Sequence, residues 1–573
     1  MYRVLVALIV LPAGLMLVWL GLRAKERRAD FVVAADGELR TIDPQRVSWL
    51  DEIQVAQALF EGLTRLSLFG DRIEPAVAAN WDFDADCNAY TFHLRPGLRW
   101  SDGAPLTADD FRLAWLRVLD PRTQAQYATL LFELSGGEAY FRSRLDADVA
   151  NDLPPSSVSV EAPDPLTLRV QLARPCPYFL ELLTFPTYAP TPPHVVSRFA
   201  GANQSRGHAE FLWTRPGNLV CNGAFTLERW DFKQRLLLRR NPAYWDTASI
   251  QPDTIEILIT GDPSAALVAY ETGRVDLVRG LESSVVRTLI SDQQSGMHGD
   301  LIVGDRFATF FLRVNCSRPP LDNADLRKAL SLAVDKQSLC TNVLGLGEQP
   351  ADNYVPPSAC AFMSRPAADG SRITYSPPRG LGADMKYEQR VALARELLRR
   401  SGYERIAASR PIELAYAAQS PQPRIAEALQ SMWESTLGIR VELRVQERKV
   451  LSSRIRALDY DLVRSDWYGD YFDPSTFLEM FTSVSGQNRT GWKNADYDRL
   501  IASALQEPDN SRRFSLFTDA ERILCERELP IIPLYFKTGN YLISPQVRLP
   551  AAALRDGLPI QRARLARTGM LRK

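Results

Sequence analysis

The chain has 573 residues, of which 46% are hydrophobic and 24% charged, so it is long enough to form several hydrophobic cores. Its 68 basic and 68 acidic residues cancel, which argues against nucleic acid as a partner because such proteins carry a strong basic patch. The histidines stand apart from one another, and no zinc-hydrolase spacing, nucleophile elbow or phosphate loop occurs. We therefore expect no metal and no cofactor, and an enzymatic function has little support.

The N-terminal segment predicts either a membrane anchor or a long signal peptide. Val4 to Leu22 carries no charge, and about 20 apolar residues suffice for a helix to cross a bilayer. No Ala-x-Ala cleavage site ends this run and it holds no cysteine for lipidation, so we favour an uncleaved anchor within residues 1–29. Positive charge is heavier after the run than before it, and the positive-inside rule then places the remainder in the cytoplasm. This charge bias conflicts with export.

From about residue 30 onward, short β-rich stretches alternate with amphipathic helical patterns. The predicted strands are 31–35, 90–94, 167–172, 255–259 and 439–445. Helices are predicted over 326–334 and 389–400, and a further one begins at Thr107 with Asp110 at capping-box spacing. Proline-rich runs mark the loops between them. This mixture predicts an α/β or α+β protein of several lobes.

Seven cysteines are present without any Cys-x-x-Cys pair, which excludes metal-knuckle and thioredoxin-like motifs. In an exported protein Cys176 could bridge to Cys221 and Cys340 to Cys360. Buried free thiols are the equally weighted alternative for each pair.

Three stretches carry a family resemblance. They are LFEGL at 59–63 with IEPAVAANW at 73–81, the run 90–119 that contains RWSDGAPLTADDF, and NGAFTLERWDFKQRLLLRRNPAYW at 222–245. In order and spacing they resemble the family-5 extracellular solute-binding proteins, the peptide-binding components of ABC importers. The resemblance runs from about residue 31 to near residue 545. RWSDGAPLTADDF also has a structural interpretation, because Gly103 can take positive φ in a turn and the helix from Thr107 buries Phe111 and Trp115. The aromatic residues of NPAYW are likewise expected in a core.

The resemblance implies an α/β, periplasmic-binding-protein-like fold with two lobes around a ligand cleft and an additional inserted α/β domain. On this chain, lobe I would be discontinuous, the inserted domain would interrupt it, and lobe II would follow. Closure of the lobes about a hinge would bury the ligand. The expected ranges are 30–65, 166–282 and 536–573 for lobe I, 66–165 for the inserted domain and 283–535 for lobe II.

Residues 459–477 (DYDLVRSDWYGDYFDPSTF) resemble the segment of oligopeptide-binding proteins that holds the amino end of the peptide. The resemblance implies that Asp470 pairs with the α-amino group and that Trp467 lines a side-chain pocket. It further implies that Arg464 meets the peptide carboxylate and that Tyr127 helps at the amino end. A buried ammonium needs a carboxylate partner, since an unpaired charge in a low dielectric costs several kcal/mol.

A protein that accepts many peptide sequences must bind what all peptides share, which is the backbone and the termini. We expect strand-like pairing with Ser48, Trp49 and Leu50 on one side of the peptide and with residues 466–468, including Tyr468, on the other.

Each side chain also has a plain structural alternative. Asp470 could be a solvated loop acid, Trp467 could belong to a core, and Arg464 could be a surface cation paired with Asp461 or Asp466.

The chain departs from the family pattern at the carboxyl end of the peptide. Positions where oligopeptide binders often place basic or imidazole groups fall at Leu344, Gln422 and Ile455, none of which can carry charge. The peptide carboxylate is then held by Arg464 alone, by other residues such as Arg454 or Arg456, or is absent from the ligand.

We therefore expect an extracytoplasmic monomer that captures short peptides for the permease subunits of an ABC importer and is not an enzyme. It would be periplasmic, attached to the cytoplasmic membrane by its N-terminal helix or released after signal cleavage. The alternatives are the same fold with another ligand (a dipeptide, glutathione, haem, a nickel chelate or a sugar) and a membrane-anchored peptide sensor.

Overall fold

The computed structural model describes residues 28–35, 37–67, 72–84, 88–145, 152–200, 209–294, 299–366, 371–403, 410–418, 421–549 and 558–566. The predicted anchor over residues 4–22 and Cys87 lie outside these ranges. Within them, no helix combines the length and the apolar character that a membrane crossing requires.

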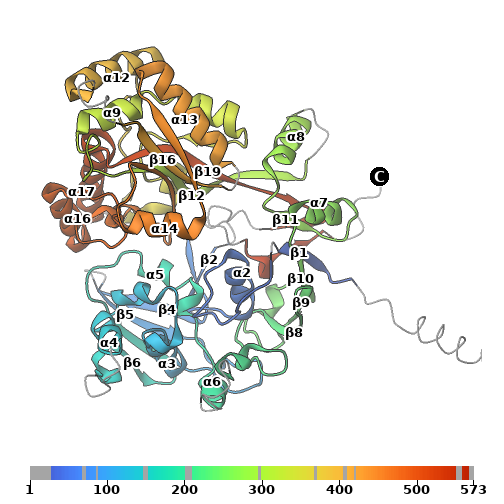
Figure 1. The fold of residues 1–573 in the computed structure, drawn as a ribbon. Coiled ribbons are helices and arrows are strands. Elements are labelled where there is room, and N and C mark those ends of the chain that lie inside the picture. Colours follow the sequence, from blue (N-terminus) through green and yellow to red (C-terminus); the bar gives the residue numbers. More distant parts are fainter. Residues whose placement is uncertain are drawn as a thin grey trace, which may run out of the picture.

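One large mixed sheet runs through both halves of the molecule (Figure 1). Parallel pairing joins β1 to β10 and β16 to β17, whereas the central strands pair antiparallel. In spatial order its strands are β17 (Val441–Gln446), β16 (Ile412–Ala417), β18 (Leu462–Tyr468), β12 (Leu301–Val314), β19 (Ile531–Ile543), β11 (Leu277–Arg279), β1 (Phe31–Ala35), β10 (Thr254–Ile259), β9 (Arg235–Arg240) and β8 (Phe225–Asp231), with β13 (Gln349–Pro350) beside β19.

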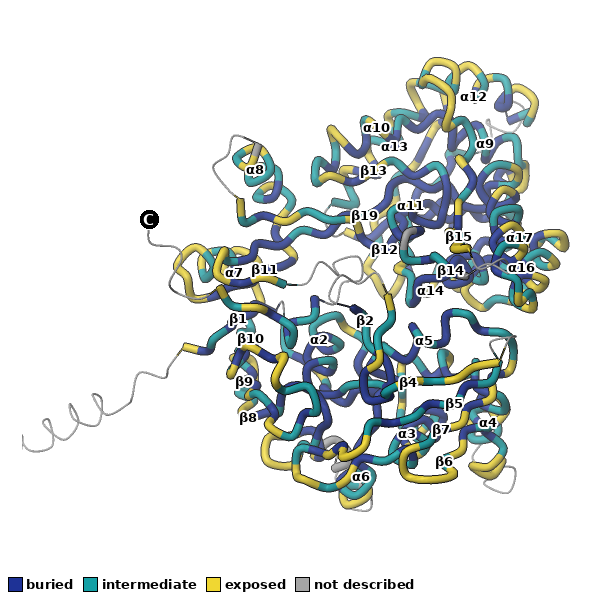
Figure 2. The backbone as a smooth tube through the Cα atoms, turned by 180° about the vertical axis from the view of Figure 1, so that it is seen from behind, coloured by how far each residue is buried: buried dark blue, intermediate teal, exposed yellow. Residues whose placement is uncertain are grey.

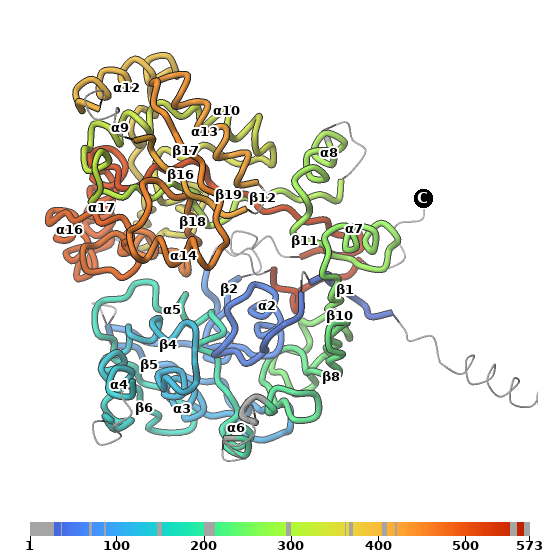
Figure 3. The backbone as a smooth tube through the Cα atoms, viewed as in Figure 1, coloured from blue at the N-terminus to red at the C-terminus, as the bar shows by residue number. Residues whose placement is uncertain are grey.

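Two long antiparallel strands, β12 and β19, connect the two lobes side by side (Figure 3). Residues 301–305 of β12 pair with residues 538–542 near β11, and residues 309–313 pair with residues 531–536 near β18. The register shifts between these two ladders. A bulge of this kind bends a strand and redirects a side chain, and Phe307 lies within it. The ribbon is therefore the two-stranded connection between the lobes, and we refer to it as the hinge.

A separate four-stranded sheet forms the inserted domain, with α3 (Ala108–Val118) and α4 (Gly137–Ser143) beside it. Its strands are β4 (Ala78–Phe83), β5 (Ala89–Leu94), β7 (Thr167–Gln171) and β6 (Val160–Asp164). Helix α3 begins with the predicted capping box, in which Asp110 accepts a hydrogen bond from the Thr107 backbone N–H at 2.8 Å. Phe111 and Trp115 are fully buried, and Gly103 takes a φ of +89°.

Helices cover the sheet in both lobes. On the lobe I side they are α2 (Leu50–Leu59), α5 (Phe179–Leu182), α6 (Pro193–Ala200), α7 (Pro263–Glu271) and α8 (Ser283–Gln294). Those of lobe II are α9 (Ala324–Leu332), α10 (Lys336–Ser338), α11 (Pro357–Cys360), α12 (Tyr387–Ser401), α13 (Gln422–Leu437), α14 (Arg448–Arg456), α15 (Ser475–Leu478), α16 (Ala495–Gln506) and α17 (Asn510–Arg522). Small hairpins pair β2 (Thr64–Leu66) with β3 (Ile73–Pro75), β14 (Ser364–Pro366) with β15 (Arg372–Thr374), and β20 (Val547–Arg548) with β21 (Arg564–Leu565).

Separate hydrophobic cores fill the two lobes, and buried segments run through both (Figure 2). One core joins lobe I to the inserted domain, whereas two others lie on opposite sides of β12 and β18 in lobe II. Helix α8 packs through Val286 with Val32 and Val278 on the lobe I side. The lobe and domain ranges stay a proposal, and α8, although it falls within the range expected for lobe II, packs on lobe I.

The predicted strands and helices agree with the structure in type, with ends displaced by at most a few residues, except for the strand expected at residues 48–50. The α/β fold class is confirmed. The six described cysteines are free thiols, so neither Cys176–Cys221 nor Cys340–Cys360 forms a bridge here. Five of the six are buried, as the alternative interpretation expects.

Candidate ligand-binding site

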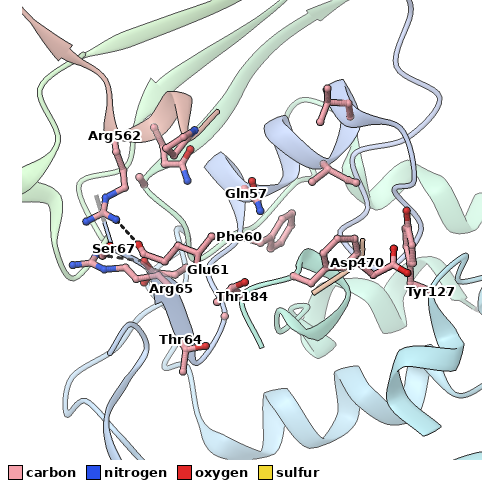
Figure 4. A pocket seen from close by; sticks show the side chains of 18 of the residues that line it. Gln57, Phe60, Glu61, Thr64, Arg65, Ser67, Tyr127, Thr184, Asp470 and Arg562 are labelled. Carbon is pink, nitrogen blue, oxygen red and sulfur yellow. Dashed lines mark hydrogen bonds and ion pairs between the residues drawn. The ribbon is translucent and has the colours of Figure 1, made fainter. Parts of the chain in front are cut away.

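A cavity of about 440 Å³ lies where lobe I, the inserted domain and the hinge meet lobe II (Figure 4). That size falls within the range of small-ligand pockets. Polar groups lie at its two ends, and Phe60 and Gln57 lie between them. The lining residues are Ser48, Leu50, Ile53, Gln57, Phe60, Glu61, Gly62, Thr64, Arg65, Leu66, Ser67, Tyr127, Thr184, Phe185, Ala224, Tyr244, Ser249, Ile250, Phe307, Tyr468, Gly469, Asp470, Pro559, Gln561 and Arg562.

Asp470 and Tyr127 form one end of the cavity, although they come from different domains (Figure 4). Asp470 lies two residues after the end of β18, and its backbone N–H donates to Thr476 Oγ1 at 3.0 Å. The Tyr127 ring packs edge-on against Phe185 at 4.8 Å between centroids. Burial and, to a smaller extent, the negative charge of Asp470 raise the pKa of Tyr127 to about 12. This end therefore combines a carboxylate with a phenol that stays protonated.

The alternation of β18 sends Trp467 and Arg464 to opposite faces, and neither lines the cavity. Trp467 packs against a lobe II core and donates from Nε1 to the Thr476 carbonyl at 2.7 Å. The Arg464 guanidinium lies 4.1 Å from the centre of the Phe310 ring, and its side chain is only 12% exposed. Its ion pair with Asp466 is long, at 3.4 Å. Arg464 is therefore not a surface cation.

The predicted strand at residues 48–50 is not formed, because Leu50 is the first residue of α2. Glu52 caps this helix by accepting hydrogen bonds from the backbone N–H groups of Ser48 and Trp49, at 3.2 Å each. Ser48 and Leu50 still line the cavity. Trp49 is 53% exposed under the Arg40 guanidinium and is not part of the lining.

Residues 466–468 do belong to a strand, as predicted, and Tyr468 lines the cavity. Residues 462–468 of β18 pair with β12 on one side. On the other side, the described pairing with β16 involves only Leu462 and Val463. The described strand pairing of residues 464–467 is therefore with β12 alone.

The uncharged positions at the expected carboxyl end lie away from the cavity. Leu344 is buried in a lobe II core, Gln422 begins α13 and Ile455 lies in α14. Arg454, one of the substitutes suggested by the sequence, is held by Glu413 at 2.8 Å and Asp459 at 3.0 Å. The other, Arg456, also lies in α14 and outside the lining.

The opposite end of the cavity carries a polar cluster that sequence reasoning missed. Glu61 accepts hydrogen bonds from Tyr244 Oη and Trp245 Nε1, both at 2.6 Å. Burial raises the pKa of Glu61, although Arg65 opposes the shift. Glu61 belongs to the LFEGL motif, and Tyr244 and Trp245 belong to NPAYW. The presence of these polar residues in two family motifs was the signal from which this cluster could have been predicted. Tyr244 was expected in a core, and it both fills a core and lines the cavity.

The described residues contain no group of three or more His, Cys, Asp or Glu side chains placed to hold a metal ion. The polar groups of the cavity are instead suited to hydrogen bonding and ion pairing with an organic ligand.

Two lobes joined by a two-stranded hinge, with a ligand-sized cavity where they meet, define a bilobal solute-binding protein. The family model of the bacterial extracellular solute-binding proteins, family 5, matches residues 72–489, and the chain belongs to this family. Because this is a family of extracytoplasmic binding proteins and not of enzymes, the prediction that the chain is not an enzyme is confirmed.

The relatives differ in the ligands that their names carry. The chain is 34% identical to the probable deoxycholate-binding periplasmic protein YgiS of Escherichia coli, over 88% of each chain. It is 30% identical to the periplasmic oligopeptide-binding protein OppA of the same species, over 89% of this chain and 87% of that one.

Solved structures extend the likeness to the whole fold. An unliganded open form of the periplasmic murein tripeptide binding protein MppA matches with a TM-score of 0.77 and 29% identity, over 94% of this chain and 98% of that one. The Haemophilus influenzae OppA complex with RPPGFSPFR matches with a TM-score of 0.72 and 26% identity, over 95% and 100%.

Proposed function

We propose that this protein binds short peptides by their amino terminus and extended backbone, and delivers them to an ABC importer. The observation that carries the proposal is the position of Asp470, whose carboxylate reaches the cavity beside Tyr127. A peptide ammonium placed there gains a charge-assisted hydrogen bond. Relatives whose names describe oligopeptide and dipeptide binding support the assignment.

The backbone of the peptide would pair with the edge of β18 that faces away from β12. An extended chain laid along residues 464–468 adds a strand to the large sheet, and its main-chain hydrogen bonds are independent of sequence. Tyr468 lies at the point where this edge reaches the cavity. The helix start at Leu50 removes the second predicted strand, so we assign Ser48 and Leu50 to side-chain contacts.

The remaining assignments come from the family and, for the membrane segment, from the apolar run in the sequence. The ligand-loaded protein would dock on the permease subunits of its importer as a monomer. Residues 4–22 would keep it at the outer face of the cytoplasmic membrane as an uncleaved anchor, or would be removed as a signal peptide.

A second candidate ligand is an amphipathic carboxylate such as deoxycholate. The name of the 34% identical relative favours it, and so do the apolar side chains of Ile53, Phe60 and Phe185 in the cavity lining. Such a ligand has no amine, so it would not need Asp470.

The test compares Asp470→Asn with wild type by calorimetric titration of short peptides into the purified protein. Loss of a hydrogen bond between two charged groups costs about 1.5–3 kcal/mol, which corresponds to roughly 10- to 150-fold weaker binding. Asp496→Asn, on the exposed surface of α16, is the matched control. Equal peptide affinity in Asp470→Asn and the control would refute the assignment, and mass spectrometry of the co-purified ligand would identify the alternative.

A further inference from the structure

The end of the cavity opposite Asp470 is built by the C-terminal segment of the chain. After β19 the chain returns to lobe I, where the short 3-10 helix Ile560–Arg562 places Gln561 and Arg562 in the lining. Figure 4 shows Arg562 above Arg65 and Glu61, with Phe60 and Gln57 between this group and Asp470.

Of the two arginines at this end, Arg65 is already engaged by acids. Its Nη1 lies 2.9 Å from Asp246 and 3.7 Å from Glu61. Its Nε is buried without a hydrogen bond, 4.0 Å from Glu74. The positive charge of Arg65 is therefore largely compensated within the protein.

Arg562 is compensated far less. Its Nη1 donates to the backbone carbonyl of Leu66 at 2.7 Å, and its ion pair with Glu74 is stretched to 3.9 Å. The side chain is only 18% exposed, so water solvates it poorly. Burial and, next, the charge of Arg65 lower the pKa of the Arg562 guanidinium, which means that an anion placed beside it would be stabilised. Next to it, Gln561 Oε1 is buried without a hydrogen-bond donor.

We infer that Arg562 forms an anion-binding subsite that receives the carboxylate of the ligand, while Gln561 accepts a hydrogen bond from a ligand N–H. This inference rests on the proposed function and deepens it. The substrate class is then a short molecule with an apolar middle, an amine directed to Asp470 and a carboxylate directed to Arg562. The subsite supplies the positive charge that the uncharged side chains of Leu344, Gln422 and Ile455 cannot supply. It also directs the ligand carboxylate to Arg562 instead of to Arg464, which lies outside the lining.

The experiment titrates the full-length protein with the tripeptide alanyl-phenylalanyl-alanine, its C-terminal amide and deoxycholate. The proteins compared are wild type, Arg562→Gln, Arg562→Lys, Arg564→Gln and Asp470→Asn. Arg564 is exposed two residues further on, outside the lining, and is the matched control. We expect wild type and Arg564→Gln to bind the free peptide about 10- to 100-fold more tightly than the amide. Arg562→Gln should bind both alike, and Arg562→Lys should retain part of the preference. Circular dichroism confirms that each variant is folded.

The outcomes separate the inference from the proposed function. Equal affinities for free peptide and amide in wild type, or an unchanged preference in Arg562→Gln, overturn the subsite and leave peptide binding intact. Binding of deoxycholate but of neither peptide, weakened in Arg562→Gln and unchanged in Asp470→Asn, overturns peptide binding and supports the anion subsite. Failure of all three probes to bind overturns both.

Discussion

Replacement of Asp473 by Asn tests how the loop that carries Asp470 is fixed. Asp473 and Arg513 are 0% and 2% exposed, and two hydrogen bonds of 2.7 Å join them side by side. Burial would raise the pKa of Asp473, but the charge and hydrogen bonds of Arg513 outweigh it and hold this pKa below its ordinary value. Removing one partner of such a pair leaves a buried charge without compensation, which costs about 3–5 kcal/mol. We expect Asp473→Asn to lower the free energy of unfolding by that amount at pH 7.

The assay is urea unfolding followed by tryptophan fluorescence, with Asp459→Asn as the control. Asp459 is 60% exposed in its ion pair with Arg454, and exposed pairs contribute about 1 kcal/mol or less. Because the folded pKa of Asp473 is depressed, its contribution is present above the unfolded pKa of about 3.9 and is lost as pH falls through the lower folded value. The deficit of the variant should therefore shrink below about pH 4. Equal losses in Asp473→Asn and Asp459→Asn at pH 7 would refute the reasoning.

Two further variants test a buried acid and a close contact. Burial raises the pKa of Glu521 to about 7, so the folded state holds a proton that the unfolded state has lost between about pH 4.5 and 7, and stability should fall across that window by about 3 kcal/mol. Glu521→Gln should remove this decline, and parallel urea titrations at pH 5 and pH 7.5 would show it; an unchanged slope would contradict the assignment. A Cβ at Gly469 would lie 2.1 Å from the Phe307 ring, so Gly469→Ala should cost about 1–3 kcal/mol and displace Asp470, with weaker peptide binding. Gly486→Ala meets nothing within 4 Å and should leave thermal melting and titration unchanged; equal effects of both alanines would remove the steric explanation.

Most of the helices and strands that were predicted could be predicted from local patterns in the sequence. Helix α3 was predictable because its cap, its acid at the third position and its apolar spacing lie within a few residues of one another. The prediction of a strand at residues 48–50 was wrong, and the residue that explains the error is visible in the sequence. Glu52 stands three residues after Trp49, and its carboxylate holds the backbone N–H groups that a strand would have offered to a peptide. The extended conformation of Trp49 was thus the start of a helix.

The two ends of the site differed in how far they could be predicted. Asp470 and Tyr127 were identified because each lies in a stretch with a family resemblance, and the structure brings both to one cavity. Arg65 and Arg562 stand at opposite ends of the chain. No local pattern links them, since their proximity depends on the return of the C-terminal segment across the hinge to lobe I.

The two ends of the cavity belong to different lobes, so the position of the lobes determines whether one ligand can contact both ends. Arg562 and Gln561 belong to a segment that packs on lobe I, whereas Asp470 follows β18 in lobe II. Glu181 of α5 already bridges the halves, because it accepts hydrogen bonds from Arg365 and from the Phe472 N–H, both at 2.9 Å. A ligand held at both ends of the cavity therefore adds a further bridge between the halves. A ligand that uses only the Arg562 end adds none, and a conformational equilibrium shifts only by the difference in affinity for its two states. On this reasoning a ligand closes the lobes only when its amine reaches Asp470 while its carboxylate is held at Arg562.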